Sequence, residues 1–189
     1  TDRIAELVGL LAAKATDSHT RLMAIDELAA VRADAKTTLE PLVAALADSD
    51  PGVRWHATRA IGLLGQDAAP AVPSLVKLLV DPDPVVVTQA AAAIGHIRGD
   101  DDREPIPEAD AALYAATVEP LVATMMHPDP RVRRATVRAL RRVSTSRQEL
   151  ARTVRRQLAD ADPIAVMPAL HTLADLGAEA VPFLVESLQ

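Results

Sequence analysis

The dipeptide Asp-Pro recurs along this chain of 189 residues, each time ahead of apolar residues spaced three or four positions apart. Of the five Asp-Pro dipeptides, four that are separated by 33, 46 and 33 residues begin at Asp50, Asp83, Asp129 and Asp162. An aspartate before a helix accepts a hydrogen bond from a free backbone N–H. Proline fits the first helical turn because its missing N–H would have had no partner there. Each Asp-Pro therefore predicts the start of an α-helix.

The residues after each Asp-Pro repeat the pattern of one buried helical face. After Pro51 the apolar or small residues are Val53, Ala57, Ala60, Ile61 and Leu64, and Gly65 follows as a stop signal. The pattern returns at the other three Asp-Pro sites and, in frame, after Asp17, which gives five copies of a helix that we name B. A second apolar segment, helix A, precedes each B helix, with Leu42, Leu75 and Leu121 at equivalent positions.

Helix pairs repeated every 20–50 residues or so are typical of an α-solenoid, in which each pair covers the apolar face of the next. We expect a single all-α domain of about five pairs, followed by an unpaired helix. The expected repeats are residues 3–33, 37–66, 70–98, 113–144 and 147–177, with a partial repeat at 180–189. Residues 99–112 form an acidic insert in the third repeat, which we interpret as an exposed loop that can include a short helical turn.

These repeats resemble the HEAT repeat family, and in particular the short bacterial HEAT-like repeats found in phycobilisome lyase subunits. The resemblance rests on Asp-Pro-x-Val-Arg at 50–54 and 129–133, on small residues in the B helices, and on a terminal glycine. It implies a right-handed solenoid in which the arginine after the valine contacts aspartates between repeats. Arg21, Arg54 and Arg133 occupy that position, whereas the third and fifth copies have Val87 and Val166, so the series is incomplete.

Charge is distributed unevenly along the chain. The net charge is −6, yet residues 131–156 contain ten arginines and one acid, which gives +9 for this window and −15 for the rest. We expect this basic belt to surround repeats four and five. The acidic insert precedes the belt, and we expect deletion of residues 99–110 to raise affinity for polyanions if the insert covers it.

No residue pattern indicates catalysis. The chain has no cysteine, its five histidines are scattered, and it has neither an HExxH motif nor a phosphate-binding glycine loop. We therefore predict no catalytic, cofactor or metal site, and interpret Asp100–Asp102 as a solvated acidic loop. No apolar run is long enough to cross a membrane. We expect a soluble protein, with the cytoplasm favoured.

The side of each B helix opposite its core residues is the candidate binding surface. At 100° per residue, that side carries positions 55, 59 and 62 of the second copy and their equivalents. We expect it to be concave, with an apolar anchor at Trp55 and charged contacts from arginines. The candidate site residues are Leu22, Trp55, Arg59, Arg134, Arg138, Arg141, Met167 and His171. Glycines at positions 62 and 95 suggest that another chain can approach closely.

The first functional hypothesis is a noncatalytic scaffold that binds an acidic or extended protein partner along this face. The alternative is nucleic-acid or other polyanion binding through the basic belt, and the third hypothesis is an enzyme accessory or a relative of HEAT-like DNA glycosylases or bilin lyases. Because the chain begins with Thr1 and its last helix lacks a partner, we expect it to be part of a longer protein. End-to-end self-association through Val181–Gln189 is a further expectation.

Overall fold

The computed structural model describes residues 2–13, 17–30, 35–99, 106–144, 147–160 and 166–167, and every regular element in these ranges is helical. The predicted all-α solenoid is confirmed. The first repeats contain α1 (Asp2–Ala12), α2 (Ser18–Ala30), α3 (Ala35–Ala45) and α4 (Pro51–Leu63). The third contains η1 (Gly65–Ala71), α5 (Val72–Lys77), η2 (Leu78–Val80) and α6 (Pro84–Arg98). Then follow α7 (Glu108–Thr124), α8 (Pro130–Val143) and α9 (Arg147–Asp160).

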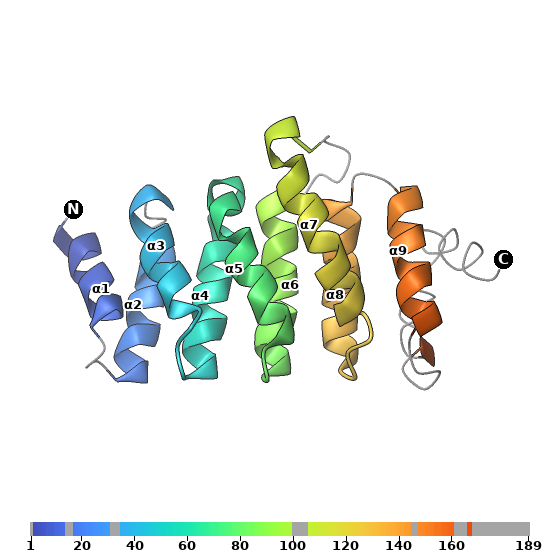
Figure 1. Ribbon diagram of the computed structural model, residues 1–189. Helices are drawn as coiled ribbons and strands as arrows, with labels where there is room; N and C mark the ends of the chain where they lie inside the picture. Colours follow the sequence, from blue (N-terminus) through green and yellow to red (C-terminus); the bar gives the residue numbers. More distant parts are fainter. Residues whose placement is uncertain are drawn as a thin grey trace.

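The helices form two layers (Figure 1). The A layer consists of α1, α3, α5, α7 and α9, and the B layer behind it consists of α2, α4, α6 and α8. Within the B layer, α2 packs against α4, α4 against α6 and α6 against α8, while α1, α3, α5 and α7 each pack against the B helix that follows and α9 packs against α7. The two middle B helices, α4 and α6, are thus each contacted by a B helix on both sides and by A-layer helices on a third.

The Asp-Pro signals form the helix starts that they predict. Asp50, Asp83 and Asp129 each precede a helix whose first residue is proline, and each carboxylate accepts a hydrogen bond of 2.8 Å from the backbone N–H two residues later. Gly65 follows α4 with φ of 62°, a left-handed conformation that favours glycine at a helix end.

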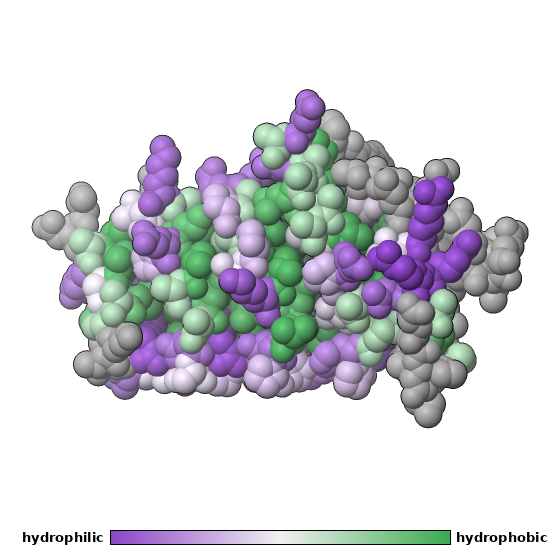
Figure 2. Space-filling model, viewed as in Figure 1, coloured by the Kyte–Doolittle hydropathy of each residue, from purple (hydrophilic) through white to green (hydrophobic). Residues whose placement is uncertain are grey.

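Ion pairs between repeats follow the pattern that the family resemblance implied. Arg21 contacts Asp48 at 2.7 Å, and Arg54 contacts Asp81 at the same distance. In the next repeat both positions differ, because Val87 replaces the arginine and His127 replaces the aspartate. His127 still accepts a hydrogen bond from the Asp129 backbone N–H, as Asp48 and Asp81 do from Asp50 and Asp83. The loop geometry is therefore retained without the carboxylate. The hydrophilic band along the lower edge in Figure 2 follows these loops.

The core is built from aliphatic and small side chains. The equivalent leucines of three A helices, Leu42, Leu75 and Leu121, are at most 2% exposed. Small residues let the B helices approach closely: a Cβ on Gly62 would lie 3.2 Å from Cα of Ala93, and one on Gly95 would lie 3.4 Å from Cα of Ala139. Both glycines are buried and serve packing between B helices. The expectation that they also admit another chain stays a prediction.

The third repeat and its insert differ from the simple pattern. Its A helix begins as a 3₁₀ helix, because Pro70 lies in η1 and Pro73 follows at the start of α5. Residues 108–112 of the predicted loop form the first turns of α7, with Glu108 and Asp110 favourably placed near its N-terminus. The rest of the insert, most of the fifth B helix and the terminal helix at 180–189 lie outside the described residues.

Candidate binding groove

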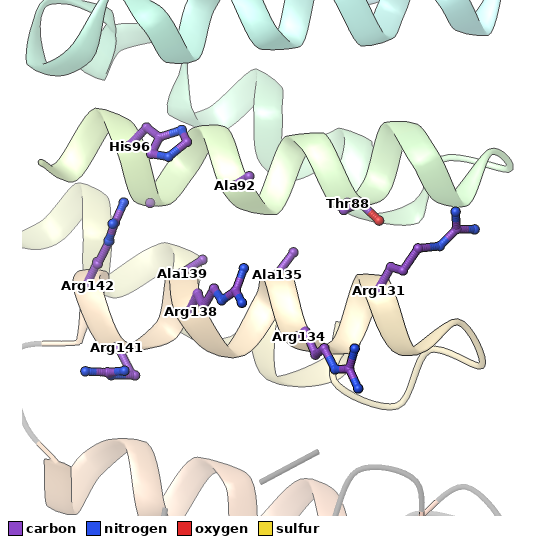
Figure 3. Close-up of a pocket in the computed structure, with 11 residues that line it drawn as sticks. Thr88, Ala92, His96, Arg131, Arg134, Ala135, Arg138, Ala139, Arg141 and Arg142 are labelled. Atoms are coloured by element: carbon purple, nitrogen blue, oxygen red, sulfur yellow. The ribbon is translucent and has the colours of Figure 1, made fainter. Parts of the chain in front are cut away.

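A groove of about 850 Å³ lies on the outer face of the B layer, between α6 and α8 (Figure 3). Helix α6 contributes small or polar side chains and α8 contributes five arginines. The lining residues are Thr88, Ala92, Gly95, His96, Arg131, Arg134, Ala135, Arg138, Ala139, Arg141 and Arg142. Five of these residues are arginines and none is acidic. We name this surface the arginine groove.

The arginines are distributed along the whole length of α8. Arg131 and Arg142 point towards α6 from the two ends of α8, and Arg138 lies between them (Figure 3). Arg131, Arg134, Arg138 and Arg141 are exposed and Arg142 is half-buried. An arginine presents a planar set of N–H donors that pairs well with carboxylate or phosphate oxygens. The groove can therefore bind an anion with several acidic groups.

One end of the groove is partly neutralised from within the chain. Arg131 lies 2.7 Å from Asp129, the residue that caps α8. This pairing raises the pKa of Arg131, and the hydrogen bond from Arg131 is the main reason why the pKa of Asp129 falls to about 2. In contrast, Arg138 has no hydrogen-bond or ion-pair partner among the described residues. The centre of the groove is consequently the most available cationic position.

Three of the predicted site residues, Arg134, Arg138 and Arg141, lie in the arginine groove. Leu22 and Trp55 are half-buried and pack against the core, and the Trp55 ring contacts His56 edge-on at 4.7 Å between ring centroids. Arg59 is exposed on α4, 3.9 Å from Asp26 on α2. Met167 is 53% exposed. His171 lies outside the described residues.

Sequence reasoning missed Arg131, Arg142 and His96. The sequence prediction placed the open side of a B helix directly opposite its core residues. In the structure, position 62 of one B helix packs against position 60 of the next, as Gly62 does against Ala93. The uncovered arc is therefore centred roughly 50° further round, near positions 59 and 63. Leu63 is accordingly 62% exposed, and His96 and Arg142 occupy the equivalent positions on α6 and α8. Rotating the predicted face by this amount would have identified all three.

Of the remaining arginines of the basic belt, Arg133 lies on α8 and donates to the backbone carbonyls of His127 and Pro128, and the others lie on α9 in the A layer. Arg152, Arg155 and Arg156 are exposed on α9, where Figure 2 shows hydrophilic side chains gathered at the right. Arg156 lies 2.8 Å from Glu119 on α7. The basic window of the sequence is thus divided between the two layers of the solenoid.

Searches of the described part of the chain for two other kinds of site gave negative results. No group of three or more His, Asp or Glu residues there could hold a metal ion. No helix there is long and apolar enough to cross a membrane.

Comparisons with known proteins identify the repeats. A family model of HEAT repeats matches residues 4–95, 39–119 and 118–189. A crystal structure of an engineered protein is 27% identical, with a TM-score of 0.66 over 99% of this chain and 85% of that one. A designed armadillo repeat protein in complex with the peptide (KR)4 is 20% identical, with a TM-score of 0.63 over 97% and 87% of the two chains. No curated protein shows significant similarity to the chain.

Proposed function

The chain belongs to the HEAT repeat family, and on this basis we propose that it is a noncatalytic scaffold that binds an acidic protein segment in the arginine groove. The observation that carries the proposal is the set of five arginines on α8, which lines a groove that contains no acidic side chain. An isolated protein gains nothing from concentrating like charges on one helix face, because they repel one another. An acidic partner would relieve that repulsion.

The shape of the groove supports recognition of a chain segment. Ala92, Gly95, Ala135 and Ala139 line the groove with small side chains, and the arginine side chains extend from α8. A peptide in the groove would meet guanidinium groups that can donate to its carboxylates and to its backbone carbonyls. A designed repeat protein of similar fold occurs in complex with a basic peptide, (KR)4. The arginine groove would instead require an acidic peptide, because its own charge is positive.

The surface beside the groove offers apolar contacts. Leu63 on α4 is 62% exposed and occupies the position equivalent to His96. Trp55 stays a proposed anchor, but it is half-buried and packs against the core, so its substitution also removes packing contacts. The arginines are therefore the better positions for testing binding without disturbing the fold.

Nucleic-acid binding is the second candidate, and the same arginines support it. Phosphate contacts by several arginines produce an affinity that falls steeply with salt. Single-strand binding proteins also stack bases on aromatic side chains, and histidine His96 is the only ring among the groove residues. This composition favours the acidic peptide over a nucleic acid.

The test is a binding titration with two fluorescent probes, a peptide of alternating glutamate and serine and a DNA duplex, at about 50 and 200 mM salt. The proposal predicts that the peptide binds and that Arg138→Gln weakens it. Arg156→Gln is the matched control, because it removes the same charge from the A layer. Tighter binding of DNA than of the peptide, lost in Arg138→Gln, would establish the second candidate instead. Binding of neither probe would overturn both.

A further inference from the structure

We infer that the acidic segment lies lengthwise along α8, parallel to the helix axis, and does not run across the stack of B helices. This inference rests on the proposed function and adds the direction, length and residue pattern of the ligand. It follows from where the charges lie. Within the part of the chain that the structure describes, all eleven groove residues belong to α6 or α8, so the groove extends along these two helices.

The five arginines follow one another along α8, with Arg131 and Arg142 pointing towards α6 and Arg134 and Arg141 pointing away from it (Figure 3). From Arg131 to Arg142 the helix rises about 16 Å, at 1.5 Å per residue. Arg134, Arg138 and Arg141 follow one another at intervals of about 6 and 4.5 Å along the axis. A ligand that follows α8 therefore meets a guanidinium group at each step along its length.

A ligand that crosses the stack would meet a different sequence of charges. The position equivalent to Arg138 is Ala92 on α6, Arg59 on α4 and Asp26 on α2. Arg59 is already 3.9 Å from Asp26, whose carboxylate also lies 2.7 Å from His56. An acidic segment on this path would pass a neutral helix and then approach a carboxylate. Charge complementarity therefore favours the path along α8.

The contacts favour an extended segment over a helix. A helix bound in a groove is held by large apolar anchors in apolar pockets, whereas this groove offers alanines, a glycine and charged groups. An extended chain advances about 3.3 Å per residue, so the length of the groove corresponds to about five residues. Side chains on one face of such a chain recur every second residue, roughly 6.6 Å apart, a spacing within reach of successive arginines. The preferred ligand has acidic residues at alternate positions.

Peptide length separates the two paths. We would titrate fluorescent peptides of alternating glutamate and serine, with five, nine and fifteen residues, at fixed salt. If the peptide lies along α8, affinity levels off near five to seven residues, apart from the small statistical gain from extra registers. If it crosses the stack, affinity continues to rise with length because each further helix adds contacts. That second result would overturn the inference while leaving the proposed function intact.

Arg138→Gln and Arg59→Gln each remove one positive charge, and comparing them provides an independent test. Arg138→Gln should weaken binding of the seven-residue peptide by roughly fivefold, and the double variant with Arg134→Gln by roughly 25-fold. Arg59→Gln lies on the same face of the B layer but away from α8, and should leave affinity unchanged. An equal loss in Arg59→Gln and Arg138→Gln would contradict the path along α8. No binding of any peptide would instead refute the proposed function itself.

Discussion

Arg54 on α4 reaches across the repeat boundary to Asp81, with Nε 2.7 Å and Nη2 2.8 Å from the two carboxylate oxygens. The side chains are only 12% and 5% exposed, and the hydrogen bond to Asp81 is the main reason why the pKa of Arg54 is raised. The same guanidinium donates to the backbone carbonyls of Asp48 and Ser49. Arg54 therefore ties together the loop before α4 and the loop before α6.

A double-mutant cycle measures the strength of this tie. We expect Arg54→Met and Asp81→Asn to show a coupling of about 1–3 kcal/mol in the free energy of unfolding, as hydrogen bonds to charged groups do. Asparagine keeps the acceptor for the Asp83 backbone N–H, so the cycle isolates the ion pair. The exposed pair of Arg3 and Glu27, at 2.6 Å, serves as the control and should show no measurable coupling. Equal coupling in both pairs would refute the special role of Arg54.

The repeat that follows lacks this ion pair, because Val87 and His127 occupy the positions equivalent to Arg54 and Asp81. We therefore expect that the pair can be introduced by substitution. Val87 is fully buried, so Val87→Arg alone places an unpaired charge in the interior and should cost about 3–5 kcal/mol. His127→Asp supplies the carboxylate found at the equivalent positions 48 and 81. The double variant should recover most of the lost stability in chemical denaturation. Strictly additive losses would show that position 127 does not face position 87.

Substitution of Gly65 and of Gly9 by alanine should change the free energy of unfolding in opposite directions. Gly65 has φ of 62° and a Cβ there would contact nothing within 4 Å, so Gly65→Ala introduces backbone strain alone. We expect a loss of about 1–2 kcal/mol. Gly9 lies inside α1 with the same free space, and Gly9→Ala should stabilise the protein by about 0.5–1 kcal/mol. Thermal denaturation of the two variants checks this, and a shift of both in the same direction would contradict it.

The cap of α8 predicts a dependence on acid pH. The pKa of Asp129 is lowered from 3.8 to about 2, chiefly by the hydrogen bond from Arg131. The folded state therefore binds fewer protons than the unfolded state between these values, and unfolding becomes easier as the pH falls. The stabilisation is fully present above about pH 4 and is lost as the pH falls through about 2.

Asp129→Asn tests this dependence because asparagine also caps helices but does not titrate in this range. We expect the free energy of unfolding of the variant to fall less than that of the parent protein between about pH 4 and pH 2. Urea denaturation at a series of pH values gives both curves. Parallel curves would show that the Asp129 carboxylate does not contribute to acid sensitivity.

Much of the fold was predictable because its signals are local. The aspartate carboxylate and the proline ring of an Asp-Pro pair act within one helical turn. Gly65 is favoured by its own backbone conformation, which has φ of 62°. Repetition then supplied the long-range information, since a helix pair that recurs must stack on its copies. In the insert, acids and prolines indicated a loop with at most a short helical turn, whereas residues 108–112 begin α7, where Glu108 and Asp110 suit a helix N-terminus.

The arginine groove was only partly predictable because its position depends on how adjacent B helices pack against one another. A helical wheel shows which side of a helix is apolar, but Gly62 and Gly95 are small for a different reason, namely the close approach of the next B helix. The same approach rotates the open face towards Arg142 and His96. Arg134 and Arg138 were identified because they lie near the edge shared by the predicted and the observed face, whereas Arg141 occupies the position equivalent to Gly62 and Gly95.

The most direct test of the account is the affinity of a seven-residue peptide of alternating glutamate and serine for the parent protein, Arg138→Gln and Arg156→Gln, measured by fluorescence anisotropy at about 50 mM salt. The account predicts binding by the parent protein, a loss of roughly fivefold in Arg138→Gln, and no change in Arg156→Gln. Equal affinity of all three proteins, or an equal loss in both variants, would contradict an arginine groove that recognises acidic segments.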